Sequence, residues 1–200
     1  MKIATIADLN DPFEWNWLTS KRPDVRNAIT QTKKRMSADF GIICFSASWQ
    51  NPVQWSHYAD KHRGICLGFD VPKQYLAEIQ YYPTRQVLNR STPDAIRSLM
   101  IRAKYEHWRY EEEWRLFEAL GGKTVENGLY FCDFSSRMKL QRVIIGPDCD
   151  VTEEVIRAGI GDTANQIEVF KARRAFKSFK IVRQRNRDLW PKDEAGGCNL

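Results

Sequence analysis

The stretch "EEEWRLFEA", residues 111–119, sets the expected fold and the expected site together. Its Trp, Leu and Phe content favours a β-strand, in which alternate side chains point to opposite faces. Glu111, Glu113 and Arg115 then share one face, while Trp114 and Leu116 anchor the other. Two carboxylates beside a cation can hold a hydroxyl group and stabilise a developing positive charge. The alternative is a solvated edge strand that carries an ordinary ion pair.

The second informative stretch is residues 45–70, "FSASWQNPVQWSHYADKHRGICLGFD". We predict a buried strand over 41–48, a helix over 51–62 that begins at an Asn cap and a Pro, and a strand over 64–71. Ser46 and Ser48 leave the first strand on one side, where small hydroxyls can contact a polar ligand. The helical spacing places Trp55 and Tyr58 on one face, with His57 off that stripe.

The remaining pattern predicts a mixed α+β fold. Its mainly antiparallel sheets carry flanking helices and form a single domain over 1–200, with a flexible tail at 191–200. We expect helices over 22–40, 91–108 and 151–160, and strands over 2–8, 112–119, 128–134, 140–146, 166–172 and 179–184.

Charge is concentrated near the C-terminal end. The chain has a formal net charge of +6, and residues 171–187 hold eight Lys or Arg and no acid, with Phe176 and Phe179 interleaved. Such a strip can bind phosphates, or it can be the solvated side of a terminal strand; both interpretations stay open. The candidate nucleic-acid-binding residues are Lys171, Arg173, Arg174, Lys177 and Lys180.

Several classes of protein are disfavoured. No apolar run is long enough to span a membrane, and the first residues lack the pattern of a signal peptide, so we expect a cytoplasmic protein without a membrane partner. Cys44, His57, His62 and Cys66 have spacings that match no strong zinc pattern, and we expect no metal. No phosphate-binding glycine loop and no serine-hydrolase elbow occur.

Four motifs carry a resemblance. "LNDPFEW" (9–15), "FSAS" (45–48), "WSHYADKHRGICLGFD" (55–70) and "YEEEWRLF" (110–117), in this order, resemble a widespread bacterial family of uncharacterised domains. The resemblance covers residues 8 to 118 with specific motifs and extends more loosely to the end.

The order of a serine strand, a helix, an apolar strand and an E-x-E strand also resembles the core of ADP-ribosyltransferases, which use NAD as a substrate. This resemblance implies that Ser46 and Ser48 line the nicotinamide pocket together with Arg115, and that Tyr58 or Trp55 stacks on nicotinamide. Glu113 would stabilise the oxocarbenium-like transition state, and Glu111 would orient the acceptor.

Those transferases also supply an Arg or His from a first strand, whereas the only basic residue before Asp8 is Lys2. Three alternatives stay open: the start of the chain is truncated, His57 or another cation takes that role, or the analogy with the transferases does not hold. The resemblance implies a toxin or phage-defence effector that modifies nucleic acid or protein, with an antitoxin or another defence protein as a possible partner. We expect His57, Tyr58, Glu113 and Arg115 to line one pocket.

Two alternatives belong to other classes. The first is a nucleic-acid-binding module that uses the basic segment 171–187, with the aromatic motifs as core. The second is a metal-independent hydrolase or nuclease that uses Asp11, Glu14, His57 and Glu113.

Overall fold

The computed structural model describes residues 1–11, 13–88 and 92–192. The fold is a mixed α+β arrangement with several mainly antiparallel sheets and a few helices, as the pattern predicted. The chain divides into two compact units, the first formed by Met1–Ala47 and Val71–Arg137, the second by Ser48–Asp70 and Met138–Leu200. Of the expected tail, residues 193–200 lie outside the described residues. None of the helices within the described ranges is both long enough and apolar enough to cross a bilayer.

A three-stranded antiparallel sheet lies at the centre of the first unit. The 111–119 segment supplies its middle strand, β9 (Glu113–Ala119), between β3 (Phe40–Ser46) and β5 (Leu76–Glu78). The edge-strand alternative is therefore wrong, because β9 pairs on both sides. The first unit also has three smaller sheets. One has the strand order β1 (Lys2–Ile3), β11 (Leu129–Phe131), β10 (Thr124–Glu126). The other two pair β2 (Leu18–Thr19) with β7 (Gln86–Val87) and β6 (Gln80–Tyr82) with β8 (Ala103–Tyr105).

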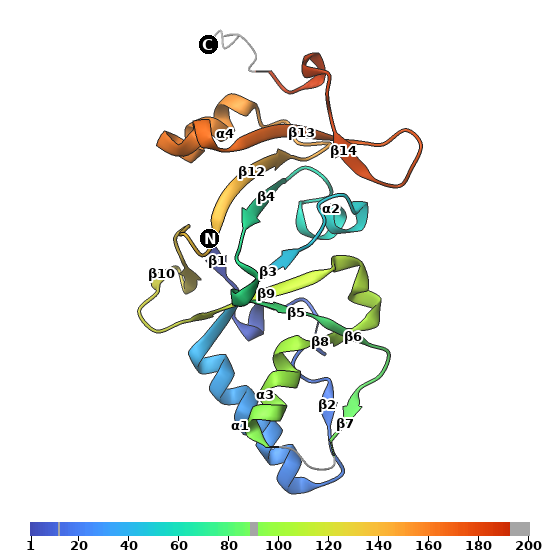
Figure 1. The fold of residues 1–200 in the computed structure, drawn as a ribbon, viewed down its shortest axis with the longest axis vertical. Coiled ribbons are helices and arrows are strands. Elements are labelled where there is room, and N and C mark those ends of the chain that lie inside the picture. Colours follow the sequence, from blue (N-terminus) through green and yellow to red (C-terminus); the bar gives the residue numbers. More distant parts are fainter. Residues whose placement is uncertain (12, 89–91, 193–200) are drawn as a thin grey trace. The chain divides into compact units, whose positions relative to one another are not determined.

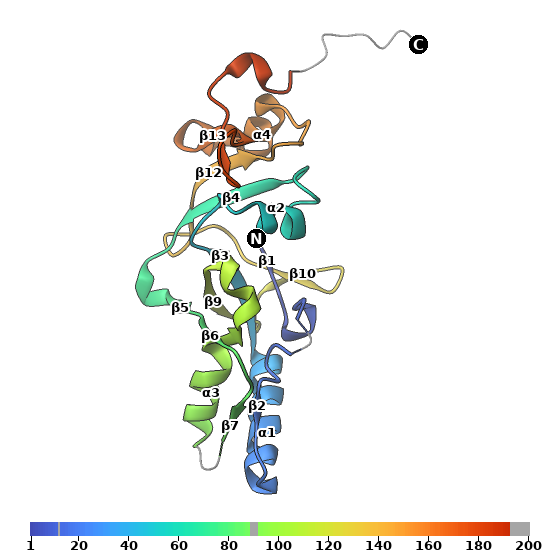
Figure 2. The ribbon, with the colours of Figure 1, turned by 90° about the vertical axis from the view of Figure 1, so that its right-hand side faces the viewer.

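Two helices of the first unit, α1 (Pro23–Asp39) and α3 (Pro93–Arg102), lie side by side (Figures 1 and 2). Each begins with Pro in its first turn, where the missing N–H costs nothing. Met36 from α1 and Ile96 and Met100 from α3 share one core with Trp15 and Trp17. The short 3₁₀ helices of this unit are η1 (Ile6–Asp8), η2 (Lys73–Tyr75) and η3 (Glu106–Glu111).

The predicted helix over 91–108 is too long. It ends at Arg102, and residues 103–105 form β8, which runs parallel to β6. The predicted strand over 2–8 is likewise only Lys2–Ile3.

The second unit has a four-stranded sheet in the order β14 (Ile181–Arg183), β13 (Glu168–Arg174), β12 (Lys139–Ile145), β4 (Ile65–Asp70). β12 and β13 are parallel and are joined through α4 (Glu153–Ile160) and η4 (Gly161–Gln166), as a parallel pair requires a crossover. Both faces of the sheet are covered. Ile144 packs in one core with Trp55 of α2 (Pro52–Tyr58), whereas Val143 packs in another with Ile156 of α4 alongside it.

The helix predicted over 51–62 also ends early, at Tyr58. Asp60, Lys61 and His62 all have positive φ angles (42°, 52° and 76°), so the chain reverses instead of continuing the helix. The amide groups of Ala59 and His62 both donate to the carbonyl of Trp55. These bonds hold three non-glycine residues in the left-handed region, which is unfavourable for each of them.

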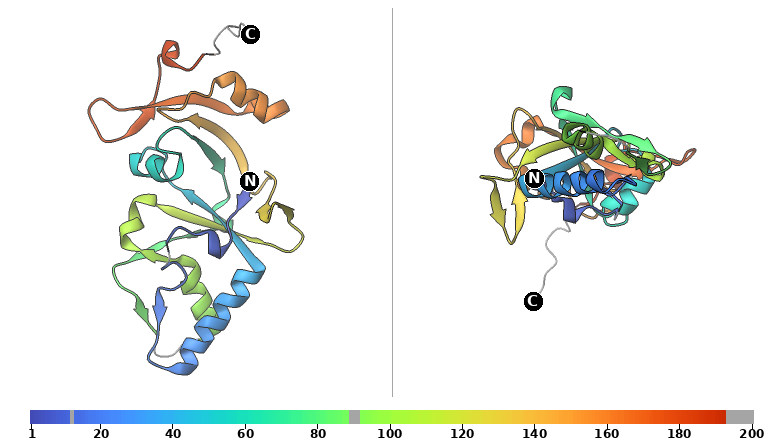
Figure 3. Two further views of the ribbon diagram at one scale, coloured as in Figure 1. Left: turned by 180° about the vertical axis from the view of Figure 1, so that it is seen from behind. Right: turned by 90° about the horizontal axis from the view of Figure 1, so that it is seen from below.

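A hairpin joins β13 to β14 in the second unit and is followed by η5 (Arg187–Leu189). Seen from two opposite sides, its loop extends away from the sheet that carries it (Figures 1 and 3).

Candidate functional site

The first unit contains a buried cluster of five charged side chains. Lys104 Nζ lies 2.5 Å from Glu111 Oε2, 2.8 Å from Glu113 Oε2 and 3.4 Å from Glu14 Oε1. Arg115 Nε donates to Glu113 Oε1 at 2.6 Å, and Arg115 Nη2 also contacts Glu14. All five residues are at most 8% exposed. The cluster therefore holds three acidic and two basic side chains away from water.

The N-D-P-F-E-W motif brings Glu14 into this cluster. Asp11 Oδ1 accepts a hydrogen bond from the Phe13 amide at 2.8 Å, and the Glu14 amide donates to the Asp11 carbonyl at 3.0 Å. Asp is common at the start of such a turn because its side chain can accept a hydrogen bond from the backbone two residues later. Trp15 follows with a φ of 62° and is 1% exposed. Packing of this indole against Phe117 fixes the turn over the charged face of β9.

Strand alternation explains only part of the cluster. Glu113 and Arg115 do share a face of β9, as predicted, but that face is buried. Glu111 does not belong to the strand: it ends η3, and Glu112, with a φ of 46°, turns the chain before β9 begins. The prediction that Glu111 reaches the site by strand alternation is wrong, since a 3₁₀ helix places it there.

The serine strand lies beside the glutamate strand. In the antiparallel pairing of β3 with β9, Cys44 is opposite Arg115 and Ser46 is opposite Glu113. Residues directly opposite in such a pair point to the same face of the sheet. Ser46 therefore shares its face with the buried cluster.

The ion pairs determine the charge of Glu113. Burial alone would raise the pKa of this carboxyl, but Arg115 and Lys104 outweigh burial and hold the pKa at about 2. Burial would lower the pKa of Lys104, yet Glu113, Glu14 and Glu111 raise it above its ordinary value. Arg115 is likewise kept protonated, mainly by Glu113, against the effect of burial. Glu113 and its two cationic partners are therefore ionised at neutral pH.

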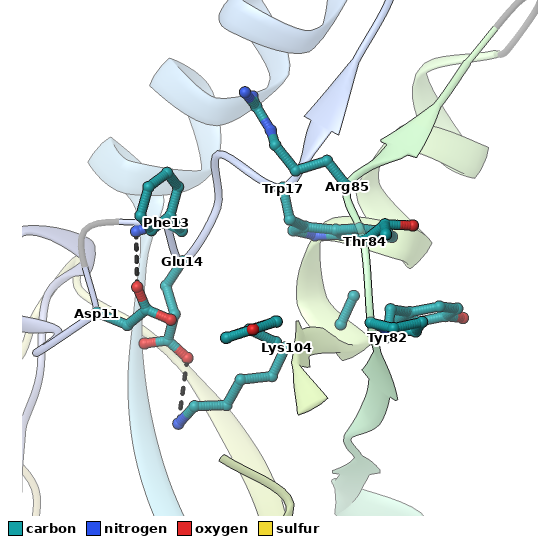
Figure 4. Close-up of a pocket in the computed structure, with 11 residues that line it drawn as sticks. Asp11, Phe13, Glu14, Trp17, Tyr82, Thr84, Arg85 and Lys104 are labelled. Carbon is teal, nitrogen blue, oxygen red and sulfur yellow. Dashed lines mark hydrogen bonds and ion pairs between the residues drawn. The ribbon is translucent and has the colours of Figure 1, made fainter. Parts of the chain in front are cut away.

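A cavity of about 330 Å³ opens next to the cluster (Figure 4). Glu14 and Lys104 belong both to the cluster and to the cavity wall, and the Asp11 carboxylate lies beside Glu14. The lining residues are Asp11, Phe13, Glu14, Trp17, Tyr82, Pro83, Thr84, Arg85, Ala103, Lys104 and Tyr105. The volume is near the lower end of the range of about 300–1,000 Å³ that is usual for small-molecule sites.

An aromatic pair forms the wall that faces the carboxylates. The rings of Trp17 and Tyr82 stack with centroids 5.3 Å apart and planes 14° from parallel. The Trp17 indole Nε1 is buried and has no hydrogen-bond partner in the described part of the chain. A buried donor without a partner costs about 1–3 kcal/mol. Trp17 lines the cavity with other atoms of its side chain, because Nε1 itself is shielded from water.

Four of the residues predicted for the NAD site belong to the second unit. Trp55 is not available to stack on a ligand: it is 3% exposed, packs in the core and donates from its indole nitrogen to the Trp49 carbonyl at 2.6 Å. Tyr58 is 51% exposed and neighbours His57, which is also exposed. The Ser48 hydroxyl accepts a hydrogen bond from the Gln50 amide. Of the residues expected to line one pocket, the structure brings Glu113 and Arg115 together in the first unit.

The predicted nucleic-acid-binding residues also separate into two groups. Lys171 is 6% exposed and donates to the carbonyls of Gly146 and Cys149, at 2.6 and 2.5 Å. It is a structural residue, and its assignment to the basic surface is wrong. Arg174, Lys177 and Lys180 are exposed and Arg173 is partly exposed.

The sequence did not single out Lys104, Trp17 or Tyr82. Lys104 lies in "IRAKYEHW", which continues the periodic pattern of α3 and therefore predicts a helix. Trp17 and Tyr82 come from segments far apart in the chain, and only the fold stacks them. The sequence did predict Asp11 and Glu14 as site residues, but only for the hydrolase alternative.

Comparison with known proteins gives one family match. Residues 54–116 match the model of a family described as a protein of unknown function (DUF2971). The matched part includes Tyr82, Lys104, Glu111, Glu113 and Arg115. Neither the curated proteins nor the solved structures contain a match to the chain.

Proposed function

We propose that the first unit is an ADP-ribosyltransferase-like enzyme that cleaves the N-glycosidic bond of NAD in the cavity beside Glu14. One observation carries the proposal: the Glu14 carboxylate lies at the boundary between the cavity and a buried cluster of three acidic and two basic side chains. In NAD the positive charge starts on the nicotinamide ring and moves to the ribose as the bond breaks, so carboxylates placed beside the ribose favour the reaction.

The chemistry follows from that charge. The bond from ribose C1′ to the nicotinamide nitrogen breaks, its electron pair stays on nitrogen, and neutral nicotinamide leaves an oxocarbenium-like sugar. Glu14, with Asp11 beside it, would stabilise this cation more strongly than the starting compound, which is the condition for catalysis. The acceptor then bonds to C1′ and gives up its proton to a carboxylate of the cavity wall. With water as the acceptor the step is hydrolysis, which connects the proposal with the hydrolase alternative.

The aromatic wall suits the leaving group. Nicotinamide is a flat ring with a carboxamide, and the rings of Trp17 and Tyr82, whose inner faces cover each other, offer it apolar carbon atoms. The indole N–H of Trp17, which is shielded from water in this structure, would turn toward the ligand and donate to the carboxamide oxygen. A volume of about 330 Å³ holds the nicotinamide and its ribose, whereas the rest of the dinucleotide would lie outside this cavity.

This proposal gives Glu113 a different role from the one the resemblance implies. Both of its carboxylate oxygens are engaged by Arg115 and Lys104, and the residue is 4% exposed. We assign it as a positioning residue that holds the two cations, and Glu14 as the catalytic carboxylate. The wider role of a cytoplasmic toxin or phage-defence effector, with an antitoxin or defence partner, is proposed together with this activity.

The test is release of nicotinamide from NAD by the full chain, with water, RNA, DNA and lysate protein as acceptors. Glu14→Gln keeps the side-chain volume but removes the charge, and we expect the rate to fall by about 10²- to 10³-fold. Glu126→Gln, an exposed position on β10, is the matched control and should retain the wild-type rate. Urea unfolding of both variants shows whether each remains folded. Absence of nicotinamide release by the wild type with every acceptor would overturn the proposal.

A further inference from the structure

The loop of the β13–β14 hairpin presents two phenylalanines to solvent. Phe176 is 90% exposed and Phe179 is 98% exposed, and the loop is closed by a hydrogen bond from the Ala175 amide to the Lys180 carbonyl at 2.9 Å. We infer that this tip binds single-stranded nucleic acid, with the two rings stacking on unpaired bases and the neighbouring cations contacting phosphates.

These rings are not part of a core. The buried clusters of the second unit contain Phe170 and Trp55, but neither Phe176 nor Phe179. Single exposed apolar residues are common, yet two almost fully exposed rings separated by two residues at the tip of a projecting loop are not required by the fold. Fully burying a Phe side chain is worth about 1.5–3 kcal/mol, so the fold forgoes that gain at both positions.

The surrounding charge is complementary to a phosphate backbone. Lys177 lies between the rings and Lys180 follows the second ring, and neither lysine forms a salt bridge with any carboxylate in residues 1–11, 13–88 and 92–192. The Arg173 guanidinium lies 4.4 Å from the centre of the Phe176 ring. Alternation of aromatic rings with cations is typical of surfaces that track single strands.

The strands below the loop are paired with each other and packed against the rest of the second unit. Arg173 pairs with Val182 and Arg174 with Ile181 across the two strands. Ile181 is 1% exposed, and its amide donates to the Gln50 carbonyl at 2.8 Å. Farther along the strands, Arg183 is paired with Glu168, so it stabilises the hairpin rather than adding an uncompensated charge. The binding groups therefore project from a well-packed base.

The arrangement of the two rings favours single-stranded nucleic acid over a duplex or a membrane. Stacking requires the face of an unpaired base, which a duplex does not offer along its length. Insertion into a membrane requires a continuous apolar tip, whereas Lys177 and Ser178 separate the two rings here. A single strand uses rings and cations together, and this inference does not depend on the NAD activity.

The experiment measures fluorescence anisotropy of labelled oligothymidine and oligouridine with the full chain, in the absence of NAD and over a series of salt concentrations. In F176S/F179S we expect the affinity to fall at least about tenfold with an unchanged salt dependence, because the rings no longer stack while the cations still bind phosphates. In K177Q/K180Q the slope of log affinity against log salt should decrease by about 0.7 for each phosphate group that the variant no longer neutralises. Val155→Ser, which replaces an apolar residue that is 56% exposed on α4, should bind as the wild type does.

Two comparisons make the result decisive. A duplex of the same length should bind more weakly than the single strand, and vesicles of phosphatidylcholine with phosphatidylserine should not require the rings for binding. Unchanged affinity in F176S/F179S would overturn the inference, as would equal binding of duplex and single strand. If the protein bound vesicles through the two rings and did not bind oligonucleotides, the partner of this loop would be a membrane surface and the inference would be wrong.

Discussion

Lys104 and Glu113 form an ion pair inside the first unit, with Nζ 2.8 Å from Oε2 and both side chains less than a tenth exposed. Charges in such a place are costly unless they are fully paired. Here each partner has a second contact, because Lys104 also binds Glu111 and Glu113 also binds Arg115. The geometry of the candidate site thus depends on a network rather than on a single pair.

Removing one charge from this network should lower stability. In Glu113→Gln one oxygen becomes an NH₂ group that cannot accept from Lys104 or Arg115, and we expect the free energy of unfolding to fall by about 3 kcal/mol. Glu112→Gln, at the exposed neighbouring position, should change it by less than about 0.5 kcal/mol. Urea titrations of the two variants provide the measurement. Equal, small effects would show that the buried pair does not support the fold.

The low pKa of Glu113 predicts acid sensitivity. The carboxyl ordinarily titrates at 4.5 and in the folded unit at about 2, so its contribution to stability is complete above the unfolded value. That contribution is lost as the pH falls from about 4.5 to about 2, and it amounts to a few kcal/mol. Urea midpoints from about pH 5 down to about pH 2 should therefore decline more steeply for the wild type than for Glu113→Gln. Parallel curves would contradict the assignment.

The unpaired indole of Trp17 predicts a specific loss of binding. Trp17→Phe retains a ring against Tyr82 but removes the N–H, so affinity for nicotinamide or NAD should decrease about threefold to tenfold. Trp15 is the matched control, since its Nε1 is also buried and without a partner in the described residues, and it does not line the cavity. Calorimetric titration of both variants should show weaker binding only for Trp17→Phe. The same loss in Trp15→Phe would indicate a general effect on packing.

Lys171 and Lys177 should respond in opposite ways to the same substitution. Lys171→Met leaves two carbonyl groups without their donor, and unfolding free energy should fall by about 1–3 kcal/mol while binding of oligonucleotides stays unchanged. Lys177→Met should leave stability within about 0.5 kcal/mol and weaken binding. Thermal unfolding and anisotropy on the same samples measure both effects. If folded Lys171→Met lost oligonucleotide binding, Lys171 would have to be assigned to the binding surface after all.

Local signals explain what the sequence predicted well. Pro23 marks the start of α1, the strand predicted over 41–48 becomes β3 at Phe40–Ser46, and alternation in β9 places Glu113 and Arg115 on one face. Each of these features depends on residues that are close together in the sequence, so the local sequence pattern is enough to predict it.

The errors have a long-range cause. Nothing in "IRAKYEHW" stops a helix, and α3 ends at Arg102 because residues 103–105 pair with β6, more than twenty positions earlier in the chain. This pairing is what brings Lys104 to Glu113. The resemblance to ADP-ribosyltransferases implied that Trp55 stacks on a ligand, but the helix buries that side against the sheet. Whether a side chain is buried depends on the element that packs against it. The spacing of residues along one segment does not show which element that is.

The division of the chain has a consequence for its synthesis and its cleavage. β4 is made early, yet its partner β12 emerges from the ribosome only after the whole of Val71–Arg137. The apolar strand must therefore wait without its partner, and the second unit cannot be completed until the first has been translated. The polypeptide also passes between the units three times, after residues 47, 70 and 137. A protease that cuts at one of these crossings leaves the two units covalently joined by the others, so a nicked protein would separate into fragments only under denaturing conditions.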